Sequence, residues 1–182
     1  RPGDARRRQM TEDATEHVTP SKEYLRRRLQ QMDPYEFEKF VADVWAYLRW
    51  ETQVVGGPGD RGIDVIATSD ADEKQLIQVK RYGPNTTVGS PEVQQYASLR
   101  IQEDNVDQVA IVTTGSFSRQ ARDLAPELGV ILINGENLLA ILDEIEAYDV
   151  FAKQFDDISI EGPTDDESEN RGLLDKVRGW FE

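Results

Sequence analysis

The 182-residue sequence contains no cysteine and a single histidine, His17, which lies in a polar N-terminal stretch. The absence of cysteine excludes disulfides, thiolate zinc sites and cysteine nucleophiles, and one isolated histidine argues against a histidine-based catalytic triad. No apolar run approaches the roughly 18 residues of a membrane span, and the arginine-rich beginning has no apolar h-region of a secretory signal. We therefore expect a soluble cytoplasmic protein without a membrane partner.

Basic residues are scarce relative to acidic ones, with 21 lysines and arginines against 35 aspartates and glutamates and a net charge of -14. Such an excess normally argues against nucleic-acid binding, because acidic surfaces repel a polyanion. However, the acids are spread over every segment and arginines outnumber lysines by 15 to 6, as in proteins of halophilic microorganisms. In molar salt the Debye length falls to about 3 Å, which screens this repulsion but also weakens counterion-driven attraction. A halophilic DNA-binding protein and an acidic protein that never meets DNA both remain open.

The length indicates one domain with appendages. We expect an N-terminal arm over residues 1–32, disordered to about residue 19 and then forming a short helix. That helix carries Leu25, Leu29 and Met32 on one side and the Arg26–Arg28 run mostly on the other. The arginines could contact a phosphate backbone, or form a solvated face.

The main domain is expected over residues 33–155 and is followed by two segments of contrasting composition. Residues 156–170 contain seven acidic residues and no basic one, which predicts an acidic linker that supplies half of the net charge. Residues 171–182 predict an amphipathic helix, which could dock on the core, on a second copy or on another protein partner.

Helical and strand patterns alternate through the main domain. Asp33 and Pro34 predict the start of a helix that runs to about residue 49, with Glu36 as a capping-box partner. Strands are predicted over 51–56, 63–68, 74–81, 109–113 and 130–133, and further helices over 90–103, 118–128 and 136–147. In the helix over 90–103 the predicted inward residues are Val93, Tyr96, Ala97 and Ile101. The order α-β-β-β-α-β-α-β-α predicts an α/β fold with a mixed sheet flanked by helices.

The second and third strands bring polar side chains together. With residues 69–73 as the hairpin loop, Thr68 faces Lys74, which sets Asp64 opposite Gln78 and Gly62 opposite Lys80. Asp64, Gln78 and Lys80 then share one face. The same register puts the apolar set on the other layer, and a shift by one residue would turn that set over. The apolar set comprises Ile63, Val65, Ile77 and Val79.

A carboxylate, an amide oxygen and an ammonium in one place suit metal-assisted hydrolysis of a phosphodiester. Magnesium takes oxygen ligands, and a nearby lysine can orient or deprotonate water and neutralise charge on phosphate. One aspartate and one glutamine form a weak metal site, so a second carboxylate is needed, and the first helix of the domain offers Glu36 and Glu38. Helical angles do not decide between them, but Glu36 is assigned to the helix cap, which leaves Glu38 free to lean over the sheet.

Four stretches together resemble the catalytic domain of Mrr-like restriction endonucleases, a branch of the PD-(D/E)xK nuclease superfamily. They are "YEFEKFVADVW" with Glu38, "GDRGIDVIA" with Asp60 and Asp64, "LIQVKRY" with Gln78 and Lys80, and "VTTGSFSRQA" after the fourth strand. The resemblance covers about residues 33–142 and implies a restriction-endonuclease-like fold with an αβββαβ core followed by αβα.

The resemblance also implies a role for individual residues. Glu38, Asp64, Gln78 and Lys80 would form the catalytic site, with magnesium, or manganese in its place, held by Asp64, Gln78 and Glu38. The Val79 carbonyl would add an oxygen, and Lys80 would activate water. Asp60 matches an aspartate of the family, and we expect it to order the turn.

Residues around this site are candidates for contact with DNA. Arg61, Arg81 and Tyr82 flank the site and could hold phosphates or stack on a base, although each could equally be structural. Ser116 and Ser118 lie near a predicted helix start, where free N–H groups suit an anion, but plain capping explains one of them. Two glutamines, Gln94 and Gln95, are expected to be solvated.

The leading hypothesis is a magnesium-dependent endodeoxyribonuclease of restriction or repair that acts on double-stranded DNA as a homodimer. A catalytically silent DNA-binding or scaffolding module on the same fold is an alternative, because Gln78 is neutral and the surface acidic. A third hypothesis is a nuclease resembling Holliday-junction resolvases, which would prefer four-way junctions.

Overall fold

The computed structural model describes residues 20–57, 59 and 62–155. The predictions for the segment 1–19, for Asp60 and Arg61, and for the acidic linker and C-terminal helix fall outside these residues.

A five-stranded mixed sheet forms the centre of the fold, in the order β1-β2-β3-β5-β7. The strands β1 (Glu51–Val54), β2 (Val65–Thr68) and β3 (Lys74–Lys80) are antiparallel neighbours, while β5 (Gln108–Thr113) and β7 (Val130–Ile133) continue the sheet in parallel. The predicted α/β class with a mixed sheet is thus confirmed. Two short strands, β4 (Thr87–Val88) and β6 (Ser116–Phe117), form a separate parallel ribbon that the sequence analysis did not predict.

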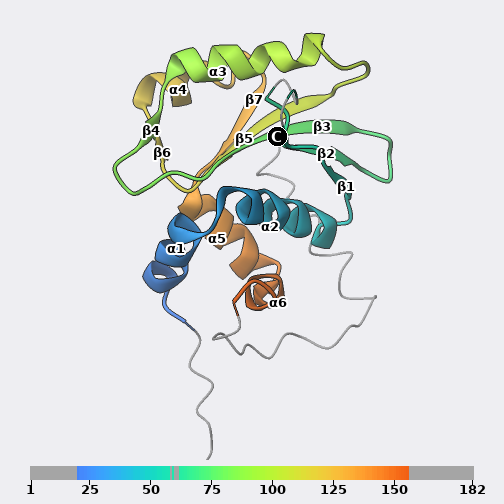
Figure 1. Ribbon diagram of the computed structural model, residues 1–182. Helices are drawn as coiled ribbons and strands as arrows, with labels where there is room; N and C mark the ends of the chain where they lie inside the picture. Colours follow the sequence, from blue (N-terminus) through green and yellow to red (C-terminus); the bar gives the residue numbers. More distant parts are fainter. Residues whose placement is uncertain (1–19, 58, 60–61, 156–182) are drawn as a thin grey trace, which may run out of the picture.

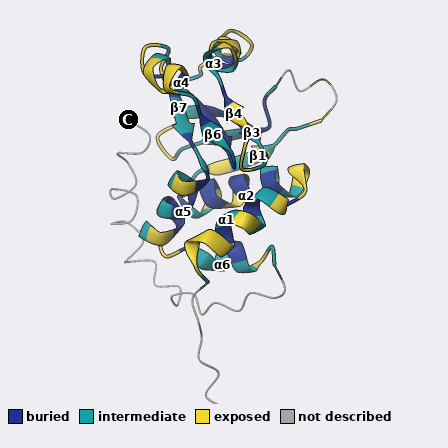
Figure 2. Cartoon of the chain, turned by 90° about the vertical axis from the view of Figure 1, so that its left-hand side faces the viewer, coloured by how far each residue is buried: buried dark blue, intermediate teal, exposed yellow. Residues whose placement is uncertain are grey.

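Helices cover both faces of the sheet (Figures 1 and 2). On one face lie α1 (Lys22–Gln31), α2 (Pro34–Tyr47), α5 (Gly135–Glu144) and α6 (Tyr148–Ala152). The other face carries α3 (Ser90–Ala97), the 3-10 turn η1 (Ser98–Ile101) and α4 (Arg119–Leu124). Each face has its own apolar cluster, with Phe37, Phe40 and Trp45 in the first and Leu76, Tyr96 and Leu99 in the second.

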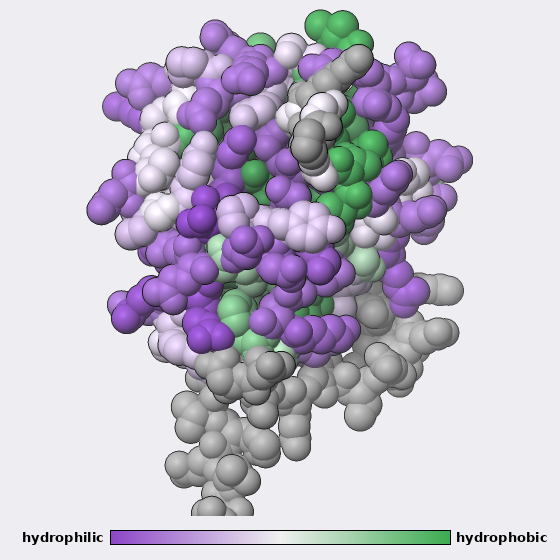
Figure 3. All heavy atoms as spheres, viewed as in Figure 1, coloured by the Kyte–Doolittle hydropathy of each residue, from purple (hydrophilic) through white to green (hydrophobic). Residues whose placement is uncertain are grey.

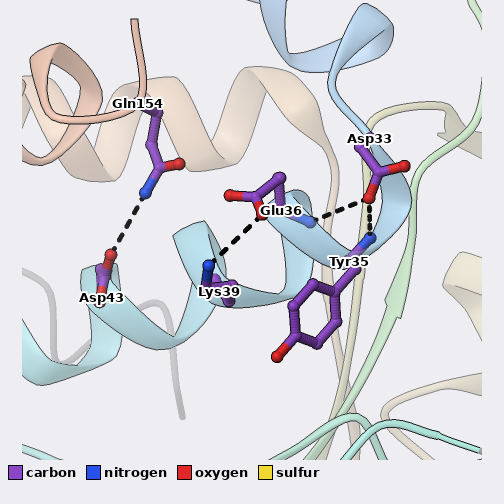
Figure 4. Close-up of polar contacts among 6 residues, drawn as sticks. All are labelled: Asp33, Tyr35, Glu36, Lys39, Asp43 and Gln154. Atoms are coloured by element: carbon purple, nitrogen blue, oxygen red, sulfur yellow. Dashed lines mark hydrogen bonds and ion pairs between the residues drawn. The ribbon is translucent and has the colours of Figure 1, made fainter.

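The start of α2 follows the predicted chemistry in part (Figure 4). The Asp33 carboxylate accepts hydrogen bonds from the backbone N–H groups of Tyr35 at 2.9 Å and Glu36 at 3.4 Å, as an N-cap does. The Glu36 carboxylate instead pairs with Lys39 at 3.4 Å on the outer side of the helix. The reciprocal half of the expected capping box is therefore replaced by a surface ion pair.

The helix after β4 ends earlier than predicted. Its N-cap is Gly89 rather than Ser90, with the Glu92 carboxylate accepting from the Gly89 N–H at 2.9 Å. The α-helix stops at Ala97 and tightens into η1, which rotates the following side chains. As a result Leu99 is buried, and Ile101, which we expected to face inward, is 88% exposed.

The apolar face of α1 packs into the same cluster as α2, because Leu25, Leu29 and Met32 are all buried there. Its arginines have protein partners. Arg26 pairs with Glu136 of α5 at 3.0 Å and Arg27 with Glu23 at 2.7 Å. Arg28 lies over the ring of Phe155, 4.3 Å from its centroid. These contacts favour the structural interpretation of the arginine run over phosphate binding.

The face seen in Figure 3 is hydrophilic over most of its area, with hydrophobic residues reaching the surface in patches between polar ones. Within the described part of the chain, every helix is too short or too polar to cross a membrane.

Candidate active site

Asp64 lies at the point where the ladder between β2 and β3 ends. The register pairs Thr68 with Lys74 and continues to Val65 and Ile77, as predicted from the loop length. At Asp64 the pairing departs from this register, because its N–H donates to the carbonyl of Ile77 at 3.0 Å. The Asp64 carbonyl accepts from Val55 at 2.8 Å, so the backbone of this residue is fixed from both neighbouring strands.

The Asp64 carboxylate turns back onto β3. Its Oδ2 accepts hydrogen bonds from the Val79 N–H at 2.6 Å and from Nε2 of Gln78. Asp64 is 6% exposed and Gln78 is 3% exposed, so the contact is buried. A buried carboxylate needs hydrogen bonds or a cation to offset the free-energy cost of its desolvation. The two hydrogen bonds from Val79 and Gln78 offset part of this cost.

The end of the ladder corrects two expectations. Gly62 lies beside Gln78 and not Lys80, since a Cβ at Gly62 would be 3.1 Å from Oε1 of Gln78. Ile63 packs in the cluster of Leu76, whereas Val65, Ile77 and Val79 pack in the cluster of α2. Strand alternation holds only where the strand is paired, and the ladder stops at Val65.

Glu38 reaches the same place from α2. A Cβ added to Gly56 would overlap with Oε2 of Glu38 and lie 3.6 Å from Oδ1 of Asp64. The two carboxylates therefore approach the same glycine from different elements. Because Glu36 pairs with Lys39 on the outer side of α2, it is Glu38 that lies beside Asp64.

Lys80 ends β3 with its backbone anchored to β5. Its carbonyl accepts from the Thr113 hydroxyl at 2.8 Å and from the Thr114 N–H at 3.2 Å. The half-buried ammonium lies 5.4 Å from the ring centroid of Tyr96. Burial, the largest influence, disfavours the charged form, but hydrogen bonding to Tyr96 and electrostatic interactions with Tyr96, Tyr82 and Asp64 outweigh it and raise the pKa of Lys80. Lys80 is thus a cation at neutral pH.

The "TTG" stretch after β5 positions the chain beyond Lys80. The Thr114 hydroxyl accepts from the N–H of Tyr82 at 2.7 Å and donates to its carbonyl at 2.6 Å. Gly115 passes so close to the carbonyl of Thr86 that a Cβ would overlap with it. This explains why two threonines and a glycine follow an apolar strand. In the sequence alone, the stretch is recognisable only as a motif.

Residues proposed to contact DNA occupy varied positions. The Arg81 guanidinium donates to the carbonyl of Gln30 at 3.4 Å and so points toward α1, while Arg61 is outside the described residues. Tyr82 is half-buried, and burial, outweighing nearby Lys80, raises the pKa of its hydroxyl. Ser116 pairs its hydroxyl with that of Thr87 at 2.9 Å across the β4–β6 ribbon.

Two other expectations concern hydroxyls and amides near the site. Ser118 is the N-cap of α4, accepting from the N–H of Ala121 at 3.1 Å. Gln94 and Gln95 are exposed on α3, as expected.

The donor set fits a hard divalent cation. Among the described residues, Oε1 of Gln78 is buried without a hydrogen-bond partner, although buried polar atoms normally have one. Oε1 lies beside Gly62 while Nε2 faces Asp64, so a turn of the amide would add this oxygen to the carboxylates of Asp64 and Glu38 and give the oxygen set that magnesium takes. In the described part of the chain, no cluster of three or more histidine, cysteine, aspartate or glutamate side chains occurs, so this set depends on an amide oxygen as its third ligand.

Tyr96 and Gly56 are the site neighbours that sequence reasoning missed. Tyr96 was assigned to the apolar stripe of its helix, which its burial bears out, but its ring also meets Lys80. The sequence predicts Gly56 only as the end of a strand. Only the tertiary contact with α2 reveals that it makes room for Glu38.

Known restriction endonucleases share the sequence pattern and the fold of this chain. Residues 29–142 match the sequence family Mrr_cat, described as restriction endonuclease. The chain is 39% identical over 127 residues to the type IV methyl-directed restriction enzyme EcoKMrr of Escherichia coli (strain K12). That match covers 65% of this chain but 40% of EcoKMrr, so the chain spans less than half of this relative.

Two solved restriction endonucleases share the fold. MspJI, solved in complex with a 27-mer oligonucleotide, superposes with a TM-score of 0.55 at 19% identity, over 90% of this chain and 42% of MspJI. AspBHI, a DNA modification-dependent restriction endonuclease, superposes with a TM-score of 0.57 at 22% identity, over 88% of this chain and 41% of AspBHI. From the family match, this chain belongs to the Mrr-type restriction endonuclease family.

Proposed function

We propose that this chain is a magnesium-dependent endodeoxyribonuclease that hydrolyses phosphodiester bonds in DNA, in a type IV restriction or repair role. The observation that carries the proposal is the approach of Glu38 and Asp64 to Gly56, together with a buried Oε1 of Gln78 that has no hydrogen-bond partner among the described residues. The ammonium of Lys80 extends from the same strand as Gln78. Membership of the restriction endonuclease family and the identity with EcoKMrr support the same reaction class.

Asp64, Glu38 and Gln78 would hold the magnesium ion, with the Val79 carbonyl as a further oxygen. Magnesium bound there would supply positive charge for the phosphate, and manganese could replace it. Gln78 would turn its amide so that Oε1, rather than Nε2, faces the ion. Lys80, as an ammonium, would donate to the attacking water or to a phosphate oxygen and stabilise its developing negative charge.

Double-stranded DNA is the proposed substrate, with a homodimer cutting both strands. Tyr82 and the hydroxyls of Ser116 and Thr87 lie on elements that follow the site, and they would contact the backbone together with Arg61. Arg81 already donates to Gln30, which favours a structural role for it. The acidic composition leads us to expect a halophilic enzyme that works in concentrated salt, where charge repulsion is screened.

Plasmid cleavage with magnesium, manganese or EDTA, at about 0.1 M and about 2 M salt, tests this function. We expect metal-dependent nicking and linearisation that Asp64→Ala and Lys80→Ala abolish. Glu38→Ala and Glu36→Ala form a matched pair on one helix, because only Glu38 reaches Asp64. Loss in Glu38→Ala with retention in Glu36→Ala supports the assignment, whereas cleavage that survives both Asp64→Ala and Lys80→Ala overturns it.

A second candidate, a catalytically silent DNA-binding module, is favoured by one contact. The amide of Gln78 donates to Asp64, which satisfies the carboxylate without a cation. Such a module would shift DNA in a gel equally in magnesium and EDTA and leave every strand intact. The cleavage assay can also compare a four-way junction with linear duplex DNA. Preferential cleavage of the junction would support the resolvase-like alternative.

A further inference from the structure

Tyr96 stands out among the buried residues of α3 because its ring faces a charge. It is 6% exposed and belongs to the apolar cluster that also holds Val93 and Leu99. Its ring centroid lies 5.4 Å from Nζ of Lys80. The same ring approaches the position of Gly62, where a Cβ would lie 3.5 Å from Cε1 of Tyr96 and 3.1 Å from Oε1 of Gln78. Tyr96 therefore borders both Lys80 and the amide end of Gln78.

We propose that Tyr96 is a positioning residue that holds the Lys80 ammonium on the Asp64 and Gln78 side of the sheet. The proposal rests on the proposed nuclease function, because it assigns Tyr96 to the arrangement of the same site. Tyr96 acts through Lys80 and needs no contact with DNA or metal.

The need for such a residue follows from the lysine side chain. Thr113 and Thr114 fix the carbonyl of Lys80, but they leave its four side-chain torsions free. Ordering a lysine side chain costs rotamer entropy, and lysine is among the residues that lose most. An aromatic ring beneath the ammonium offsets this cost through the attraction between a cation and the ring's negative face.

The identity of the residue supports the assignment. Its neighbours in this cluster are mainly aliphatic, and a leucine or phenylalanine would fill the same space without a polar atom. The tyrosine hydroxyl supplies a polar group for an ammonium, and hydrogen bonding to Tyr96 is one of the influences that raise the pKa of Lys80.

Gly62 gives independent support from the other side of the ring. Its φ of +86° is a conformation that favours glycine, and a side chain there would push between Gln78 and Tyr96. The turn before Asp64 thus leaves the ring free to meet the site.

Two substitutions and one control test the proposal. Tyr96→Phe removes the hydroxyl and keeps the ring, while Tyr96→Leu removes both. Val93→Ala truncates a buried neighbour on α3 that lies outside the site, and it controls for loss of packing alone. We expect kcat for DNA cleavage to fall roughly tenfold in Tyr96→Leu, and less in Tyr96→Phe, with KM for DNA within about twofold of the starting protein. Val93→Ala should lower the melting temperature but keep kcat.

A second measurement does not depend on activity. With lysines labelled by carbon-13 at the ε position, the six lysines give six signals, and Lys80→Arg identifies that of Lys80. A methylene held over an aromatic ring is shifted upfield by the ring current, so we expect this shift to persist in Tyr96→Phe and Val93→Ala and to vanish in Tyr96→Leu.

Three results are decisive. Unchanged kcat in Tyr96→Leu, or a Lys80 signal that it does not move, overturns the positioning role. Absence of metal-dependent cleavage by the unsubstituted protein overturns the proposed function. In that case the shift of the Lys80 signal alone tests whether Tyr96 holds Lys80. If Tyr96→Leu does not fold, Tyr96→Phe, which preserves the ring volume, decides the test by its loss or retention of kcat.

Discussion

The amide of Gln78 donates to the same oxygen of Asp64 that accepts the N–H of Val79 at 2.6 Å. One carboxylate oxygen thus takes two donors from β3, while no described residue hydrogen-bonds to Oε1 of Gln78. The contact ties Gln78 of β3 to Asp64 beside the end of β2. It also predicts how a glutamate at position 78 would behave.

Gln78→Glu should lower the stability of the protein in the absence of metal. Binding of magnesium should restore the stability of this variant. The substitution replaces a donor with a second buried carboxylate, and like charges this close repel each other, at a cost of about 3 kcal/mol. A divalent cation that binds both carboxylates removes that repulsion and stabilises the folded state by mass action, about 2.7 kcal/mol at 100 times its dissociation constant. Thermal melts in EDTA and in rising magnesium measure both effects.

Gln75→Glu is the matched control, because Gln75 is fully buried on the same strand but lies between Trp45 and Gln108. It should lose stability equally in EDTA and in magnesium. Rescue of Gln75→Glu by magnesium, or no rescue of Gln78→Glu, would contradict a cation site at Asp64.

Gly56→Ala should impair catalysis more than folding. The new methyl group would overlap with Oε2 of Glu38, and this flexible side chain can swing away at less than about 1 kcal/mol. The carboxylate would then leave Asp64, and misplacement by about 1 Å can cost roughly 100-fold in rate. Melting temperature and kcat measured together test this separation.

Gly57→Ala provides the comparison for that variant. A Cβ at Gly57 meets nothing within 4 Å, so both its stability and its rate should stay close to those of the parent. Equal loss of activity in the two variants would show that the loop backbone, and not Glu38, is responsible.

The sequence predicted most of the sheet, because alternation and a five-residue loop together determine the register of β2 and β3. It failed where pairing stops: Ile63 lies beyond the last pair and packs in the other cluster. Ile101 was misplaced because a helical stripe gives no sign that α3 tightens into a 3-10 turn. The strands β4 and β6, two residues each, are too short to show alternation.

The site was predictable to a similar degree. The shared face of Gln78 and Lys80 follows from alternation along β3, whereas Asp64 lies beyond the last paired residue of β2, and helical angles alone could not separate Glu36 from Glu38. That choice depends on Gly56, a contact between elements far apart in sequence. The contact between Tyr96 and Lys80 was not predictable, because core packing alone already explains a buried aromatic residue on a helix.

Thr114→Val should loosen the segment that follows Lys80. Valine has the shape of threonine but removes the hydroxyl that accepts from and donates to the backbone of Tyr82. Leaving these groups unpaired costs about 1–3 kcal/mol each where they are buried. Chemical denaturation measures the loss, and Thr87→Val, which removes an exposed hydroxyl on the β4–β6 ribbon, should change stability by less than about 0.5 kcal/mol. Similar losses in both variants would contradict a special role for Thr114.

Asp143 should make stability depend on pH through the contact between α1 and α5. Its carboxylate accepts from the Tyr148 hydroxyl at 2.7 Å and from Lys22 at 3.0 Å, and these contacts lower the pKa of Asp143. A lowered pKa stabilises the folded state above the unfolded value of about 3.9, and this contribution is lost as the pH falls through the folded value. Because the side chain of Asp143 is 51% exposed, solvent limits the effect to about 0.5 kcal/mol.

Asp143→Asn should therefore be less stable than the parent above about pH 5, with the difference shrinking toward about pH 3. Asp43→Asn is the control, because Asp43 lies on the exposed side of α2 and its partner, Gln154 at 3.5 Å, is uncharged (Figure 4). Denaturation curves across this range compare the three proteins. A difference between Asp143→Asn and the parent that stays constant from about pH 7 to about pH 3 would mean that the carboxylate charge does not contribute to the docking of α1.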